Sequence, residues 1–226
     1  MFQGLIKNEK EIEIMRGLGK ILSSIFDELK KDIKPGTDVW DLETKFLKLC
    51  EQSNVNPSCK VYGEGELPPF PTGLCLSINE ESVHCFPKTG VVLKEGDIVN
   101  VDTVIDYSGL HVDSAFCHPV GKVTDKNSRF METSKTALFN SIEKVRDGAK
   151  IGLIANTMQK TVEREGFNVL KDYAGHGIGH SMHEYPEIPC YGNKHDGPKI
   201  KENMTICIES LICEGNEKVE NVSECE

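Results

Sequence analysis

Two aspartates, eleven residues apart, are the first residues whose types and spacing suggest chemistry. Asp102 ends the run Gly96–Asp102, and Asp113 lies in the run Gly109–Ser114, after a turn near residues 107–108. If the two runs are adjacent antiparallel strands, the hairpin places both carboxylates opposite one another on one face. Two carboxylates in a half-buried sheet repel, and burying both is costly unless a cation compensates. We therefore expect a divalent metal ion beside this pair.

Two later segments offer further metal ligands. His176 lies in Gly175–Glu184, where flanking glycines permit close backbone approach or positive φ, and His183 follows seven residues on. Glu209 ends Met204–Glu209, an apolar segment that we expect to form a strand. A single acid is more often solvated and a lone histidine more often structural, so only the ordered set is informative. Two Asp, one His and one Glu suit Mn, Fe, Co or Zn, including metal pairs in hydrolytic sites.

Hydrophobic periodicity and turn residues predict the elements that must hold these side chains. We expect a first helix, capped by Asn8, over residues 8–31 and a second helix capped by Thr37. The order helix–helix–strands then occurs twice, which indicates an α+β fold of two similar halves sharing a sheet. The remaining expectations are helices over 126–147 and 153–165, strands over 73–79, 97–106, 109–118, around Val169 and over 204–213, and an irregular loop over 54–71.

Composition limits the class of protein. The 226 residues carry a net charge of −10, which argues against a nucleic-acid partner because phosphate recognition needs basic surface. Nine scattered cysteines without a C-x-x-C pair argue against a disulfide framework or a structural zinc site. No signal peptide and no apolar stretch of membrane-spanning length is present. We expect one domain in a reducing, cytoplasmic setting.

In order and spacing, these motifs resemble a type I methionine aminopeptidase. The resemblance implies the pita-bread (creatinase/aminopeptidase-like) α+β fold, in which two pseudo-symmetric halves share a curved antiparallel sheet flanked by helices. It implies a single metallopeptidase domain over residues 1–226 that lacks the last strand or strands. The matching text is Cys75–His84, Gly96–Asp102, His111–Asp113, Gly175–Pro186 and Met204–Glu209.

The resemblance also implies an activity, namely metal-dependent removal of the initiator methionine from nascent proteins. Asp102 would chelate one of two divalent ions (Co, Mn, Fe or Zn) and Asp113 would bridge both. His176 and Glu209 would hold the other ion, and a metal-bridging hydroxide would attack the first peptide bond. His183 would hydrogen-bond the substrate carbonyl or tetrahedral oxygen, and His84 would serve as a polar or proton-transfer group beside the substrate amide.

The apolar pocket for the methionine side chain would be lined by Phe70, Cys75 and Met182, although ordinary core packing explains these three residues equally well. The expected partners are N-terminal peptides of nascent proteins, with the ribosome as a further candidate. We expect a monomer that engages neither a membrane nor nucleic acid directly. Four histidines receive no role and are expected to be structural or exposed: His111, His118, His180 and His195.

The sequence departs from the family pattern at two places. The family's last ligand, a second bridging glutamate in a Gln-aromatic-Glu-His strand, has no counterpart after Glu209, and we do not expect Glu224 or Glu226 to substitute. Three carboxylates would then face two divalent ions, where the family supplies four. The loop Glu66–Pro71 also lacks the histidine that usually precedes the pocket aromatic, at Phe70.

Two other interpretations remain open from the sequence. A catalytically impaired member of the fold could act as a binding protein, which the departure at the last ligand favours. Retention of the Asp, Asp, His, His and Glu set opposes this interpretation, because a site without chemistry has little reason to keep all five. A proline-directed peptidase of the same fold is the third alternative, and such enzymes usually carry a large N-terminal domain.

Overall fold

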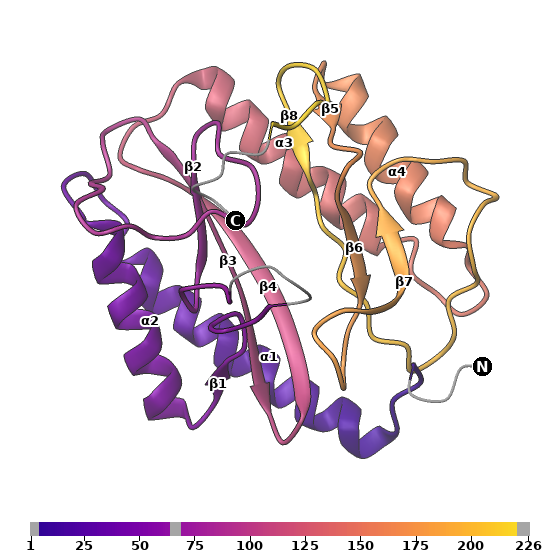
Figure 1. Ribbon diagram of the computed structural model, residues 1–226. Coiled ribbons are helices and arrows are strands. Elements are labelled where there is room, and N and C mark those ends of the chain that lie inside the picture. Colours follow the sequence, from indigo (N-terminus) through magenta and orange to yellow (C-terminus); the bar gives the residue numbers. More distant parts are fainter. Residues whose placement is uncertain (1–4, 64–68, 221–226) are drawn as a thin grey trace. The chain divides into compact units, whose positions relative to one another are not determined.

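The computed structural model describes residues 5–63 and 69–220. Within these residues the chain divides into two compact units, which we describe separately (Figure 1). The N-terminal unit comprises residues 13–124, and the C-terminal unit comprises residues 125–220 together with residues 5–12. Part of the loop before Phe70, and both Glu224 and Glu226, lie outside the described residues.

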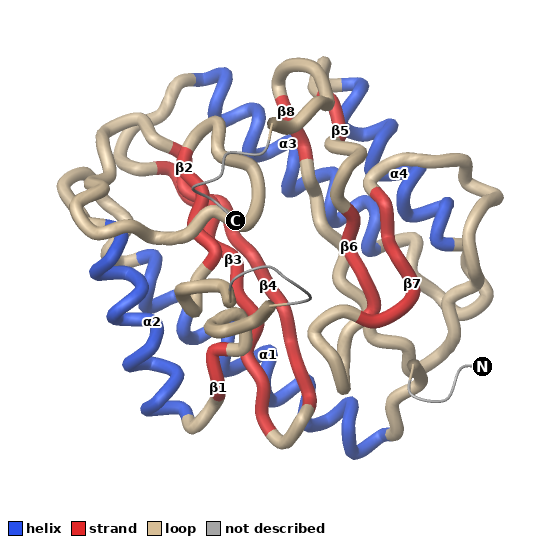
Figure 2. Tube along the Cα trace, viewed as in Figure 1, coloured by secondary structure: helices blue, strands red, loops and turns tan. Residues whose placement is uncertain are grey.

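The N-terminal unit contains two helices and a sheet of four antiparallel strands. The long strand β3 carries β4 along its whole length, while β1 and β2 pair with different parts of β3 (Figure 2). The predicted helix pair and hairpin are therefore present, close to the expected bounds. The elements are α1 (Glu9–Lys30), α2 (Val39–Ser53), β1 (Asn56–Pro57), β2 (Cys75–Ile78), β3 (Ile98–Tyr107) and β4 (Leu110–Pro119).

The helix starts show local capping chemistry. Asn8 Oδ1 accepts a hydrogen bond from Glu11 N at 3.0 Å, and Glu11 Oε2 accepts one from Asn8 N at 2.8 Å, which is a reciprocal capping box. The predicted cap of α2 at Thr37 is wrong by one residue. Asp38 is the cap, because its side chain accepts from Trp40 N at 2.9 Å, whereas Thr37 Oγ1 donates to Asp32 O instead.

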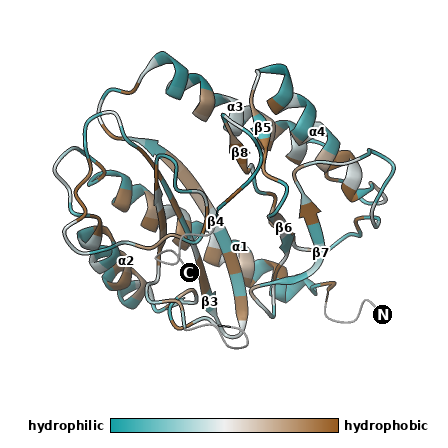
Figure 3. Cartoon of the chain, turned by 45° about the horizontal axis from the view of Figure 1, so that its top comes forward, coloured by the Kyte–Doolittle hydropathy of each residue, from teal (hydrophilic) through white to brown (hydrophobic). Residues whose placement is uncertain are grey.

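Apolar and polar residues alternate around α1 and α2, so each of these two helices has a largely apolar buried stripe (Figure 3). In the N-terminal unit the stripe of α1 consists of residues spaced by three and four, and all are almost fully buried. Burying such side chains stabilises a fold by about 1.5–3 kcal/mol each, before conformational entropy is subtracted. The buried residues of α1 are Met15, Leu18, Leu22, Ile25, Phe26 and Leu29.

The C-terminal unit repeats the helix–helix–strands order. Its core packs the apolar side of α4, represented by Met158 and Val162, against Phe167 and Val169. The helix predicted to reach residue 147 ends earlier, because the next residues form tighter turns with bonds to the third preceding carbonyl. The elements are α3 (Asp125–Ile142), α4 (Ile151–Arg164), β5 (Asn168–Val169), β6 (Ala174–Gly177), β7 (Glu184–Pro189) and β8 (Ile212–Cys213).

The strand predicted over residues 204–213 is only partly present. Residues 212–213 form β8, whereas Met204 and Ile206 make single bridges, to Ile6 and Gly177. The segment nevertheless runs beside β6, because Ile178 N donates to Thr205 O at 3.1 Å and Cys207 N donates to His176 O at 2.7 Å. Glu209 therefore lies on an extended, half-buried segment rather than at the end of a buried strand.

Among the described residues, no helix combines the length and the apolar character that crossing a lipid bilayer requires.

Candidate metal centre

In the N-terminal unit, Asp102 and Asp113 lie on one face of the β3–β4 hairpin. Asp102 pairs with Ala115, and Asp113 pairs with Val104. The two acids are thus diagonal neighbours, at about 7–8 Å between Cα atoms, rather than directly opposite as predicted. The strand register differs from the predicted one by two residues because the turn lies one residue later. It consists of Ser108 and Gly109, both with positive φ, instead of residues 107–108.

A pair of thiols lies beside these acids. Cys75 on β2 pairs in register with Asp102, and Cys59 Sγ accepts a hydrogen bond from Val104 N at 3.4 Å. The pKa of the Cys75 thiol is raised well above its usual range, first by its hydrogen bond with Cys59 and then by its burial. Cys75 is therefore a neutral thiol at pH 7, which suits an apolar lining better than a thiolate ligand.

In the C-terminal unit, glycines on both sides of His176 are required by close backbone approach. A Cβ added at Gly175 would lie 2.3 Å from Cys207 O, and one added at Gly177 would lie 2.3 Å from Tyr185 O. Of the two reasons expected for these glycines, close approach is confirmed. The packing holds the β6 backbone, and with it the His176 ring, between two neighbouring segments.

The His176 ring and the Glu209 carboxylate face one another. His176 Nδ1 is 2.8 Å from Gly177 O, and a carbonyl can only accept, so Nδ1 carries the proton of the neutral ring. Nε2 then presents a lone pair, 3.6 Å from Glu209 Oε1. Two ligands bound to one ion at about 2.0–2.2 Å come to lie about 3–3.6 Å apart. The pair therefore fits a shared divalent cation, in the tautomer that metal-binding histidines use.

His183 lies against the same ring. The two imidazoles make an edge-to-face contact, with centroids 4.5 Å apart. His183 belongs to the loop 178–183 between β6 and β7 and is exposed, whereas its neighbour Met182 is buried. The C-terminal unit thus brings together three of the predicted site residues, His176, His183 and Glu209, and the buried Met182 directly precedes His183 in the sequence.

The remaining predicted residues belong to the N-terminal unit. Phe70 is half-buried and its ring makes an edge contact with Phe86 at 6.0 Å between centroids. His84 is exposed and has a left-handed backbone, with φ of 58°. Among the histidines without an expected role, His118 is half-buried, and burial lowers its pKa, while His180 and His195 are exposed.

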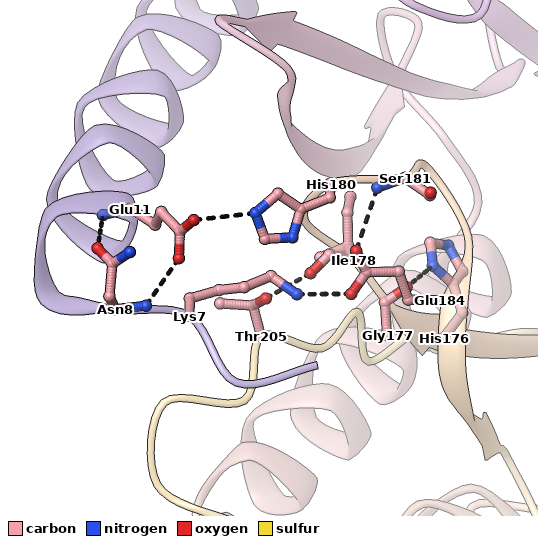
Figure 4. A network of polar contacts seen from close by, with 10 residues as sticks. All are labelled: Lys7, Asn8, Glu11, His176, Gly177, Ile178, His180, Ser181, Glu184 and Thr205. Atoms are coloured by element: carbon pink, nitrogen blue, oxygen red, sulfur yellow. Dashed lines mark hydrogen bonds and ion pairs between the residues drawn. The ribbon is translucent and has the colours of Figure 1, made fainter. Parts of the chain in front are cut away.

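Lys7 belongs to the C-terminal unit and pairs with the residue after His183, but sequence patterns do not identify it. Its side chain is fully buried and its Nζ lies 2.6 Å from Glu184 Oε2, immediately after His183 (Figure 4). A lysine just before a helix cap normally predicts a solvated side chain. The only sequence signal at Glu184 is that this acid directly follows His183.

Comparison with protein-family models matches residues 13–222 to metallopeptidase family M24. The chain is 34% identical over 220 residues to methionine aminopeptidase 1 of Bacillus subtilis and 37% identical over 219 residues to a methionine aminopeptidase of Clostridium acetobutylicum. Each alignment covers 97% of this chain and 86% of the relative.

Solved structures give the same result. A methionine aminopeptidase of Thermotoga maritima superposes with a TM-score of 0.92 at 37% identity, over 96% of this chain and 86% of that one. A prolidase of Pyrococcus furiosus, at 20% identity and a TM-score of 0.74 over 90% of this chain and 56% of that one, shares the fold alone. These matches confirm the expected pita-bread fold. The chain belongs to metallopeptidase family M24 and, within it, to the methionine aminopeptidases.

Proposed function

We propose that this protein removes the N-terminal methionine of nascent polypeptides by metal-dependent hydrolysis of the first peptide bond. The relatives named methionine aminopeptidases support the reaction class, and they align with nearly the whole chain. The observation that carries the proposal is the facing of His176 Nε2 and Glu209 Oε1, two acceptor atoms whose spacing fits a shared cation. Because the family match includes residues of both units, we propose that residues 1–226 form one catalytic domain.

The proposed ligands are Asp102, Asp113, His176 and Glu209, holding two divalent ions drawn from Co, Mn, Fe or Zn. The two aspartates share one face of a hairpin, which favours bound cations because unscreened carboxylates there repel. Such ions lower the pKa of water and polarise a carbonyl, which is the chemistry that hydrolysis of an amide needs. The carbonyl of Gly177 accepts from Nδ1, so in the neutral ring Nε2 carries the lone pair that a metal ion binds.

His183 and His84 are proposed to act on the substrate amide. His183 is exposed and its ring contacts His176, so it can donate a hydrogen bond to a carbonyl oxygen close to the ligands. His84, also exposed, is proposed as the polar or proton-transfer group beside the amide nitrogen. Phe70, Cys75 and Met182 are proposed to line the pocket for the methionine side chain, consistent with the neutral state of the Cys75 thiol.

The test begins with the full chain freed of metal by chelation. Isothermal titration with Mn²⁺ or Co²⁺ is expected to show two bound ions, and the loaded protein is expected to release methionine from Met-Ala-Ser. N-acetylated Met-Ala-Ser is the matched control and should not be cleaved, since an aminopeptidase requires a free amine. Absence of release with every metal, in a chain that circular dichroism shows to be folded, would overturn the proposal. Binding of a single ion would overturn the dinuclear assignment alone.

The ligand assignment has its own test. Glu209→Gln keeps the shape of the side chain but removes the charge, and is expected to weaken metal binding by at least about tenfold. Glu187→Gln, an exposed acid on β7, is the matched control and should leave metal affinity unchanged. Equal affinities for the two variants would exclude Glu209 as a ligand.

A further inference from the structure

The segment before α1 is joined to the loop that carries His183 by a buried ion pair. Lys7 Nζ lies 2.6 Å from Glu184 Oε2, with side-chain exposures of 0% and 10%. A fully buried ammonium persists only when it is paired, because desolvation of an isolated charge is too costly. We propose that Lys7 is a positioning residue for catalysis, which holds the loop 178–183, and so His183, in its working geometry. This inference rests on the proposed role of His183.

Glu184 connects Lys7 with the loop itself. While Oε2 accepts from Lys7, Oε1 accepts a hydrogen bond from Ser181 N at 3.1 Å. In the sequence His183 lies between Ser181 and Glu184, so the hydrogen bond from Ser181 N to the Glu184 carboxylate closes a short loop that contains it. Removing Lys7 would leave a buried carboxylate without its cation. The carboxylate would then turn toward water, which weakens its bond to Ser181 N.

Gly179 is matched to the path of the lysine. A Cβ added at Gly179 would lie 1.9 Å from Lys7 Cε and 2.5 Å from Lys7 Nζ. Any side chain at this position would displace the ammonium group from Glu184. The absence of a side chain at Gly179 therefore leaves the space that the Lys7 side chain occupies.

The backbone of Lys7 is held by the segment that leads to Glu209. Lys7 N donates to Asn203 O at 2.9 Å, and the neighbouring Ile6 bridges to Met204. The same segment bonds the start of the loop, because Thr205 Oγ1 donates to Ile178 O. Lys7 thus connects two segments, one leading to the proposed ligand Glu209 and one carrying His183. Its ion pair sets the position of His183 relative to the ligand pair.

A second contact to the same loop provides a matched control. Glu11 Oε1 lies 2.9 Å from His180 Nε2, also between the start of the chain and the loop. This pair is exposed, with side-chain exposures of 24% for Glu11 and 46% for His180. Surface ion pairs contribute little, so Glu11→Gln tests loss of a charge without loss of the buried pair.

The first experiment is a double-mutant cycle on the metal-loaded full chain. Lys7→Met is expected to lower kcat for Met-Ala-Ser by at least about tenfold, with KM changed less than about threefold, since His183 is misplaced rather than lost. In a His183→Ala background, Lys7→Met is expected to lower kcat by less than about twofold further. The reason is that the side chain that Lys7 positions is already absent. Glu11→Gln should change kcat less than about twofold. Equal losses from Lys7→Met in both backgrounds would overturn the proposal in favour of a purely structural role.

The second experiment needs no catalytic activity, so it separates this inference from the proposed function. Hydrogen exchange followed by mass spectrometry is expected to show faster exchange of residues 178–184 in Lys7→Met, with unchanged exchange in α3 and α4. Glu11→Gln should resemble the wild type. Unchanged exchange in the loop would overturn the proposal even if the enzyme is active. Should Lys7→Met fail to fold, Lys7→Met/Glu184→Gln removes both charges, and the same losses are expected from it.

Discussion

Replacing Gly177 by alanine should disturb the candidate metal centre through its backbone. The added Cβ would lie 2.3 Å from Tyr185 O and 2.9 Å from Glu184 O, while real Cβ atoms keep at least about 3.0 Å. Both obstacles are backbone atoms of β7, so no side chain can rotate away. The two strands must separate by at least about 0.7 Å, or the pairing of Gly177 with Glu184 must break.

The size of the effect follows from this displacement. Overpacking that moves backbone costs about 1–3 kcal/mol, which lowers Tm by about 2–4 °C per kcal/mol in a chain of this size. His176 precedes Gly177, and the Gly177 carbonyl accepts from its Nδ1, so the ligand moves with the strand. A displacement approaching 1 Å can cost about 100-fold in rate. We expect a modest loss of stability together with a loss of kcat/KM of about that size.

The assay compares Gly177→Ala with Gly17→Ala, by thermal unfolding and by release of methionine from Met-Ala-Ser. Gly17 lies within α1, and a Cβ there meets nothing within 4 Å, so alanine should stabilise the chain by about 0.5–1 kcal/mol. Activity of the control variant should equal that of the wild type. A Gly177→Ala variant with unchanged Tm and unchanged kcat/KM would refute the close approach of β6 and β7.

Three further predictions concern the N-terminal half of the sequence. Asn8→Ala removes the capping box of α1 and should cost about 1 kcal/mol in urea unfolding; an unchanged midpoint would contradict it. Burial raises the pKa of the Glu43 carboxyl group above 4.5 in the folded chain. The stability that this protonated carboxyl contributes is complete below the unfolded pKa and is lost as pH rises through the folded pKa. Wild type should therefore lose stability relative to Glu43→Gln as pH rises, and a constant difference would refute this. Burial of Cys50 raises its pKa to about 12, so iodoacetamide at neutral pH should modify it only after unfolding, as peptide mapping would show.

The sequence identifies candidate metal ligands, but it does not specify the backbone that holds them. Asp102 and Asp113 were recognisable because two acids in apolar, alternating runs need a compensating cation, and both do lie on one face of a hairpin. The register was wrong by two residues, because the positive φ values of Ser108 and Gly109 place the turn at those two residues. Small differences in turn position thus escape a pattern that identifies the strands correctly.

The strands β6 and β7 could not be predicted from hydrophobic alternation. β6 has the sequence Ala-Gly-His-Gly, and β7 contains two prolines, so both resemble loops. Their glycines are required by backbone atoms of residues distant in sequence, such as Cys207 O beside Gly175. The buried position of Lys7 escapes for the same reason, since its partner is 177 residues away.

That separation has a consequence for how the chain folds during synthesis. At about 5–20 residues per second, a ribosome needs about 10–35 s after Lys7 to reach Glu184. Throughout that interval neither Glu184, which pairs with the Lys7 ammonium group, nor Asn203, which accepts from the Lys7 backbone amide, has been synthesised. Docking of Lys7 therefore waits for the synthesis of Glu184 and Asn203, and the loop with His183 acquires its fixed geometry only after these distant segments have met.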